Sequence, residues 1–321
     1  MRRKQALACA LAVWSVLCGA CAQAADKVIA GTLGGQAPLW PFYIALHKGF
    51  LAAQGIDMEL NFAPSGSGVV QQLTGGSLDV IVSVGLPEPL QAIDKGAKLA
   101  LIRIIGKSAP YVLIGKANIT SLADLRGKTI SIGLSNDITN VYFERMMAGT
   151  GLKKGDYDII SAGVAAARLA ALEAGVADAA MLLPPLNFHA EKKGYHAVAL
   201  AADYVKDIPF TGMALSRAWA EAHRDIVHRL LAATDQSIAW LTDPGHRGEA
   251  TDLLVKVAHA SPEDAEASYD FLRKIGYFEP SSKVSRAQLQ TLIDEERARG
   301  LVDAGLTVER LVLPDMTEVT Q

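Results

Sequence analysis

The stretch that decides the fold is residues 27–62, KVIAGTLGGQAPLWPFYIALHKGFLAAQGIDMELNF. An apolar run over 27–35 predicts a buried strand that ends in a glycine-rich turn, and residues 38–55 predict a helix that stops at Gly55. Residues 56–64 then alternate between apolar and polar side chains, as a half-buried strand does. A strand, a helix and a second strand in this order form a βαβ unit, so the stretch predicts an α/β fold.

The same alternation continues along the chain. We expect further strands at 78–85, 98–106, 111–119, 128–135, 157–163, 177–185 and 196–203. We expect helices at 65–76, 87–96, 121–127, 136–151, 164–175 and 186–194. From Arg217 onward the pattern is helical only, at 217–242, 247–259, 262–275 and 285–299, and the tail 311–321 is expected to be loosely held. Strands and helices that alternate in this way predict mostly parallel sheets.

One sequence pattern occurs twice. Leu73-x-x-Gly76-x-x-Asp79 precedes one predicted strand, and Leu172-x-x-Gly175-x-x-Asp178 precedes another. In each, a helix ends on glycine and a turn-forming aspartate comes before an apolar strand. Any two α/β units can share such turns. The alternative is two lobes built on the same plan, which face each other across a cleft.

The N-terminus predicts export. Arg2, Arg3 and Lys4 precede an apolar stretch over 6–17, and Ala22-Gln23-Ala24 provides a small-residue cleavage site. We expect residues 1–24 to be a cleaved signal peptide and the mature protein to be periplasmic. A buried N-terminal helix is the structural alternative. Lipid anchoring through Cys21 is less favoured, because the position three residues earlier is Cys18 and not the usual leucine of a lipobox.

The cysteine content and the charge exclude several classes of function. Cys9, Cys18 and Cys21 all lie in the expected signal peptide, so the mature chain has no disulfide, no thiolate nucleophile and no cysteine-ligated metal. Removal of the signal leaves 28 basic against 34 acidic residues, a net charge of −6. That charge argues against nucleic acid and against an anionic membrane surface as partners.

No motif for catalysis or cofactor binding is found. The seven histidines form no HExxH or HxH pair, and the chain has no GxSxG, GxGxxG or GxxxxGK[ST] pattern. We therefore predict no catalytic residues, no metal and no cofactor.

Ligands of open α/β sheets bind outside the carboxyl ends of the strands, and helix N-termini there offer free N–H groups to anions. The candidate ligand-binding residues at these ends are Gln36, Trp40, Ser65, Gly66, Ser67, Ser83, Asn136, Asp137, Thr139, Pro184 and Phe210. Each has a structural alternative: the serines can simply cap helices, Trp40 and Phe210 can pack in the core, and Asp137 can simply stabilise a helix dipole. No arginine stands in these turns, where a sulfonate or carboxylate clamp would be expected.

Several segments resemble the substrate-binding proteins for aliphatic sulfonates, taurine, nitrate and thiamine pyrimidine precursors. These segments are Pro41-Phe42-Tyr43-Ile44-Ala45, Gly49-Phe50-Leu51, Gly55-Ile56-Asp57-Met58-Glu59, QQLTGGSLDVIVSVG (71–85) and SLADLRGKTISIG (121–133). The resemblance covers roughly residues 27–280. It departs from the family at Ser65-Gly66-Ser67-Gly68 and at Leu182-Leu183-Pro184-Pro185, which leaves the ligand open.

The resemblance implies a type II periplasmic binding protein with two α/β lobes, a ligand between them and two hinge crossings. On this basis we expect lobe 1 to comprise 25–112 and 213–321, and lobe 2 to comprise 113–212. The implied function is delivery of a small anionic or polar organic solute, sulfonate-like or pyrimidine-like, to the permease of an ABC importer in the inner membrane. We expect a monomer. The alternatives are an enzyme similar to the thiamine-pyrimidine synthases, which carry a cysteine-rich motif, and the ligand-binding subunit of a periplasmic sensor.

Overall fold

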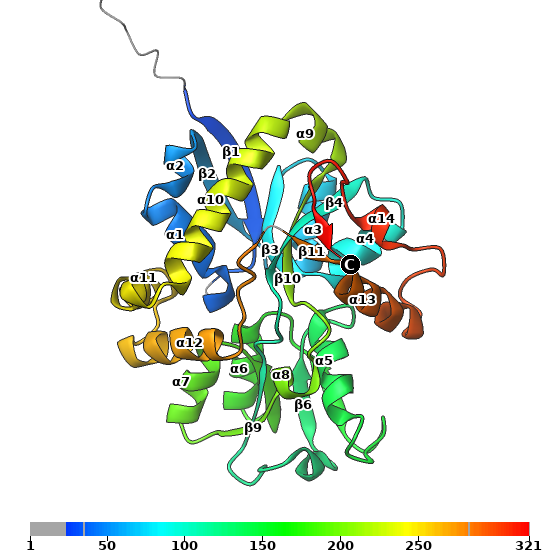
Figure 1. Cartoon of the computed structure of the whole chain (residues 1–321). Coiled ribbons are helices and arrows are strands. Elements are labelled where there is room, and N and C mark those ends of the chain that lie inside the picture. The colour runs from blue at the N-terminus through cyan, green and yellow to red at the C-terminus, as the bar shows by residue number, and fades with distance from the viewer. Residues whose placement is uncertain (1–23, 35, 282, 321) are drawn as a thin grey trace, which may run out of the picture.

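The structure, a computed structural model, describes residues 24–34, 36–281 and 283–320. The expected signal peptide, with its three cysteines, lies outside the described residues except for Ala24. Two five-stranded sheets, one above the other in Figure 1, form the centres of two α/β units. The predicted two-unit α/β fold is therefore confirmed.

The two sheets have the same plan. The first has the order β2 (Ile56–Phe62), β1 (Asp26–Thr32), β3 (Val80–Gly85), β10 (Thr211–Ser216) and β4 (Leu99–Gly106). The second has the order β7 (Asp158–Ser161), β6 (Thr129–Ile132), β8 (Ala179–Leu182), β5 (Val112–Gly115) and β9 (His196–Leu200). In each sheet the fourth strand, β10 or β5, is antiparallel to both of its neighbours, and the other described pairings are parallel.

The repeated sequence pattern has one structural role in both units. The Asp79 carboxylate accepts the N–H of Ile29 at 2.8 Å, and the Asp79 N–H donates to the Ile29 carbonyl at 2.8 Å. Asp178 makes the same two bonds with Thr129, at 3.0 and 2.7 Å. The preceding glycines, Gly76 and Gly175, have φ angles of 77° and 75°, which favour glycine. Matching bonds at matching strand positions favour two units of the same design over a chance likeness of turns.

The chain passes from the first sheet to the second between β4 and β5, and returns between β9 and β10. We propose that these two passages are the hinges, with the lobe boundaries at 112/113 and 212/213. The strands β5 and β10 begin close to these positions, at Val112 and Thr211.

Helices cover the sheets and connect the units. The first unit contains α1 (Trp40–His47), α2 (Phe50–Ala53), α3 (Gly66–Thr74) and α4 (Pro87–Asp94). The second contains α5 (Ile138–Met147), α6 (Ala165–Glu173), α7 (Leu186–Lys192) and α8 (Ala201–Tyr204). The C-terminal part contains α9 (Arg217–Ala222), α10 (Arg224–Thr242), α11 (Arg247–Ala258), α12 (Pro262–Lys274), α13 (Arg286–Ala298) and α14 (Val308–Leu311). Three 3₁₀ turns lie at Ala37–Leu39, Leu122–Leu125 and Pro244–His246.

The C-terminal helices do not all belong to one unit. Helix α10 packs on α1 and α2 of the first unit, and α13 and α14 pack on α4 (Figure 1). Helix α12, however, contacts α7 of the second unit, where the rings of Phe188 and Phe271 lie 5.8 Å apart. Lys192 of α7 pairs with Asp264 of α12 at 2.8 Å. The last third of the chain thus also bridges the two units.

Three expectations need correction. The single helix predicted at 38–55 is broken, because Gly49 has a φ of 75° and separates α1 from α2. The helix predicted at 217–242 is interrupted at His223. The tail is not loose, since Leu311, Val312 and Met316 are buried. Val312 also forms a bridge to Leu101 of β4. The short strands β11 (Val284–Ser285) and β12 (Val319–Thr320) pair in parallel.

None of the helices in the described part of the chain combines the length and the hydropathy that a membrane crossing needs.

Candidate functional site

Two adjoining cavities lie between the units, where the strands of both sheets end. Both are lined by Leu33, Gln36, Glu88, Tyr111 and Asp137. Their volumes are about 30 and 20 Å³, enough for about one water molecule each. A larger ligand therefore requires the units to separate, or the lining side chains to move, before it enters.

The first unit contributes the start of α3 and the end of β3. Ser65 caps α3, because its hydroxyl accepts the Gly68 N–H at 3.1 Å, and the Ser67 hydroxyl lies 3.2 Å from that of Ser65. Ser65, Gly66 and Ser67 line the second cavity, and Ser83 lines the first. Capping and cavity lining thus coexist at Ser65.

The second unit contributes the turn that starts α5. Asn136 lines the second cavity and Asp137 lines both. Asp137 is also the cap of α5: its carboxylate accepts the N–H of Thr139 at 2.8 Å and the Thr139 hydroxyl at 2.6 Å. Thr139 is fully buried and its hydroxyl accepts the Gly133 N–H at 2.9 Å, so it fixes this turn and does not line either cavity.

The remaining candidates divide between the core and the cavity. Trp40 is fully buried away from both cavities, where its indole N–H donates to the Ala250 carbonyl at 2.9 Å. Pro184 is not a lining residue either, but its carbonyl accepts the N–H of Ala37 at 3.1 Å and so links the second unit to the first. Phe210 lines the first cavity and meets the Tyr111 ring edge-on, with the ring centres 5.2 Å apart.

Glu88 lines both cavities and was not among the predicted site residues. It stands in the first turn of α4, directly after β3, and is 7% exposed. Its Oε2 atom has no hydrogen-bond partner within the described chain. Burial raises the pKa of this carboxyl well above its usual range, and the negative charge of Asp137 adds to the effect. An acid at a helix start after a buried strand was the available signal, although it usually marks only a helix dipole.

Arg168, in the first half of α6, lines the second cavity and was not predicted either. It is 1% exposed, and its Nε and Nη1 atoms have no hydrogen-bond partner in the described part of the chain. Its guanidinium lies over the Tyr111 ring, 5.3 Å from the centre. The turns indeed lack an arginine, but this one reaches the second cavity from a helix. A single cation in the run VAAARLAAL (164–172) was the signal for it.

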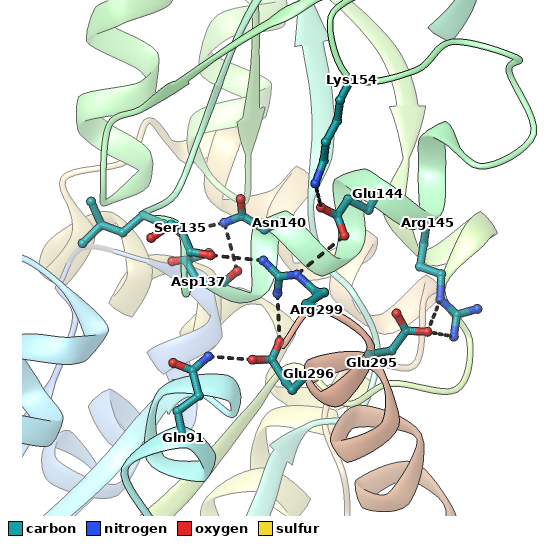
Figure 2. Close-up of polar contacts among 11 residues, drawn as sticks. Gln91, Ser135, Asp137, Asn140, Glu144, Arg145, Lys154, Glu295, Glu296 and Arg299 are labelled. Atoms are coloured by element: carbon teal, nitrogen blue, oxygen red, sulfur yellow. Dashed lines mark hydrogen bonds and ion pairs between the residues drawn. The ribbon is translucent and has the colours of Figure 1, made fainter. Parts of the chain in front are cut away.

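A polar network beside the site joins the two units (Figure 2). Arg299, just after α13, pairs with Glu296 at 2.9 Å and with Glu144 of α5 at 3.6 Å, and it donates to the Ser135 carbonyl at 3.1 Å. Glu296 in turn accepts a bond of 2.6 Å from Gln91 of α4. The network therefore connects α4 of the first unit to the turn that carries Asp137.

A second ion pair supports the same junction. Arg145 of α5 donates from Nε to Glu295 of α13 at 2.8 Å, and Asp207 lies 3.6 Å from its Nη2. Figure 2 shows this pair beside the Arg299 network. On the other flank, α12 and α7 make the contact described above. Bridging contacts between the units are thus made both by α13 with α5 and by α12 with α7.

No group of three or more histidine, cysteine, aspartate or glutamate side chains is placed to hold a metal ion among the residues that the structure describes. The site consists of hydroxyls, an amide, two carboxylates, one guanidinium and aromatic walls, which is a set suited to binding a small polar molecule.

The sequence matches a family model and a curated protein. The model of the family described as NMT1/THI5 like matches residues 36–246. A putative binding protein, YtlA of Bacillus subtilis, is 20% identical over 265 residues, which cover 79% of each chain.

Two solved structures have the same fold. The alkanesulfonate-binding protein SsuA from Xanthomonas axonopodis pv. citri, bound to MOPS, has a TM-score of 0.75 at 20% identity, with 93% of this chain and 100% of that chain covered. The periplasmic nitrate-binding protein NrtA from Synechocystis PCC 6803 has a TM-score of 0.73 at 16% identity, with 92% and 86% covered.

Proposed function

Because the chain belongs to the NMT1/THI5-like family, we propose that it is an extracytoplasmic solute-binding protein that delivers a small polar solute to an ABC importer. The family resemblance found in the sequence is confirmed by this match. The names of the relatives support binding over catalysis: YtlA is called a binding protein, SsuA binds an alkanesulfonate and NrtA binds nitrate.

The observation that carries the proposal is the pair of cavities between the units. Gln36, Ser65, Ser67 and Ser83 of the first unit and Asn136 and Asp137 of the second line them. A ligand held by both sets makes its full contacts only when the units are together. Its binding therefore shifts the protein toward the closed arrangement.

The same geometry favours binding over chemistry. The polar groups are spread over both walls, as in a site that holds a small molecule by contacts from two sides. The cysteine-rich motif of the thiamine-pyrimidine synthases has no counterpart in residues 25–321, which contain no cysteine. We therefore propose a binding protein and not an enzyme.

Export and partner follow from the proposed role. The N-terminal pattern of residues 1–24 supports secretion into the periplasm, where a monomeric binding protein meets an importer permease.

A thermal-shift screen with sulfonates, nitrate, pyrimidines, aromatic acids and amino acids tests the proposal. A ligand at 100 times its Kd stabilises the folded state by about 2.7 kcal/mol, so a true ligand raises the melting temperature. Small-angle scattering should then show a smaller radius of gyration with the ligand bound. Gly66→Leu is the site-blocked control and should abolish the shift. A ligand that still binds to Gly66→Leu with full affinity would place the site elsewhere.

A further inference from the structure

Two buried groups of opposite charge share the second cavity. Glu88 comes from α4 of the first unit and Arg168 from α6 of the second. Each has buried polar atoms without a hydrogen-bond partner in the described part of the chain. One wall of the cavity therefore carries an unpartnered carboxyl group and the other an unpartnered guanidinium.

Their free atoms are unusual for a folded protein. Buried polar atoms are nearly always hydrogen-bonded, and a buried charge without a partner carries a large desolvation cost. Here Glu88 Oε2 and Arg168 Nε and Nη1 are all buried and unpartnered. A protein retains such groups where a bound ligand supplies their missing partners, because a binding site often lowers the stability of the free protein.

Nearby groups give the cavity two electrically different ends. Asp137 lies close enough to Glu88 to add negative potential, so the acidic end has two carboxylates. The Arg168 guanidinium, by contrast, lies against the Tyr111 ring, and Gly163 and Val164 line the same cavity. A ligand that lies across the cavity meets both ends.

We propose that the ligand is a small amphoteric molecule, whose anionic group pairs with Arg168 and whose ammonium or other N–H donor pairs with Glu88. The inference rests on the proposed solute-binding function and narrows its ligand class. Each charged group of the ligand pairs with one buried charged group of the protein, and the ligand itself adds no net charge to the closed cavity. A ligand with an anion alone leaves Glu88 unpaired beside Asp137, and a ligand with a cation alone leaves Arg168 unpaired.

The raised pKa of Glu88 adds a second consequence. Without a cation beside it, this carboxyl keeps its proton to a higher pH, because it is desolvated and faces Asp137 and Glu296. The other ionisable groups near it are Arg168 and the phenol of Tyr111. A bound ammonium favours the carboxylate, so binding releases a proton. Affinity should therefore rise with pH until Glu88 is ionised in the free protein.

The test uses matched probes on the mature chain. The amphoteric probes are β-alanine, γ-aminobutyrate and taurine. Their anionic counterparts are propanoate, butanoate and ethanesulfonate. Their cationic counterparts are ethylamine and propylamine. Calorimetry should show at least one amphoteric probe binding about tenfold or more tightly than each of its counterparts. An anionic counterpart that binds as tightly as its amphoteric parent would overturn the inference and leave the solute-binding function intact.

Variants locate the contacts. For the amphoteric probe that binds, Arg168→Met and Glu88→Gln should each weaken affinity about 30-fold or more, as loss of one partner of a buried charge pair does. Arg126→Gln and Glu249→Gln, at exposed ion pairs away from the cavities, are the matched controls and should bind normally. Wild-type affinity in Glu88→Gln contradicts the inference.

The melting temperatures of the ligand-free variants distinguish a role in ligand binding from a role in folding alone. Arg168→Met removes an unpaired buried charge and Glu88→Gln removes an unpartnered buried carboxyl, so their melting temperatures should equal or exceed that of the wild type. If Arg168→Met does not fold, Arg168→Lys keeps the charge and should retain a weaker affinity with the same preference for amphoteric probes. A screen in which only neutral or wholly anionic solutes bind overturns the ligand class, whereas a screen with no binder of any charge contradicts the proposed function itself.

Discussion

Gly66 lies directly against the carboxyl group of Glu88: a Cβ atom added at Gly66 would lie 2.2 Å from Glu88 Oε1. Glycine at this position lets the start of α3 approach the acid of α4. The glycine-rich turn that departs from the family pattern therefore has a specific use here. It makes room for the carboxyl group of Glu88.

Gly66→Ala should weaken ligand binding with little loss of stability. The added methyl displaces Glu88, and the end of a long side chain can move without disturbing the backbone. We expect affinity to fall about tenfold, while the melting temperature changes little. Calorimetry and thermal unfolding measure the two effects. Gly248→Ala is the control, because nothing lies within 4 Å of its added Cβ; equal affinity losses in both variants would contradict the assignment.

Ser65 and Ser67 should separate the capping role from the binding role. Ser65 caps α3 through the Gly68 N–H, so Ser65→Ala should cost about 1 kcal/mol in the free energy of unfolding. Ser67→Ala removes no cap and should cost less. Each change should weaken binding by only about 0.5–1.5 kcal/mol, since a neutral hydrogen bond is lost. Denaturant unfolding and calorimetry on both variants decide this, and a larger stability loss in Ser67→Ala would reverse the two roles.

The pH dependence of stability should reveal the buried Glu88. Its pKa in the folded protein is raised by burial, so the folded state binds the proton more tightly than the unfolded chain does. The stability it contributes is present below its ordinary pKa of 4.5 and is lost as pH rises through the raised value. The Glu88→Gln variant loses no stability from this source over that pH range, because glutamine does not ionise. Its melting temperature relative to wild type should therefore increase from about pH 4 toward neutral pH; a constant difference would mean that Glu88 is ionised normally.

How much of this could be predicted differs between the fold and the site. Alternation of strands and helices is local information, and the repeated Leu-x-x-Gly-x-x-Asp pattern even marks the bonds of Asp79 to β1 and of Asp178 to β6. Strand β10 was missed because TGMALS is short and pairs with strands more than 100 residues away in the chain. Its position depends on the return passage, which no local pattern encodes.

The site was harder to predict from the sequence, because the predicted strand ends identify only the residues of the turns as candidates. Asp137 and the residues Ser65–Ser67 lie in such turns and line the cavities. Glu88 and Arg168 lie on helices, and only the arrangement of α4 and α6 around one cavity shows that they are unpaired. Trp40 illustrates the opposite problem: its place at a strand end is compatible with a ligand, but its indole N–H bonds inside the core.

The mature N-terminus should be Ala25. Strand β1 begins at Asp26, whose N–H donates to the Gly55 carbonyl at 2.8 Å and whose carboxylate pairs with Arg229 at 2.5 Å. Cleavage after Ala24 leaves both contacts intact, whereas cleavage beyond Asp26 would remove them. The intact mass of the exported protein checks this. A lipid-modified Cys21 at the N-terminus would show that the protein is anchored.

The pair of Arg145 and Glu295 should tune affinity without touching the ligand. It joins α5 of the second unit to α13 beside the first, so it exists only while the units are together. Arg145→Gln should therefore lower the population of the closed arrangement. A partly exposed ion pair is worth about 0.2–1 kcal/mol, which corresponds to an affinity loss of up to about fivefold. High salt should weaken wild-type binding in the same direction, because it screens the pair.

Arg126→Gln is the control, since its partner Asp156 lies in the same unit. Calorimetry measures the affinities, and scattering without ligand should show a larger radius of gyration for Arg145→Gln than for Arg126→Gln. Equal radii and equal affinities in these two variants would mean that the pair plays no part in closure.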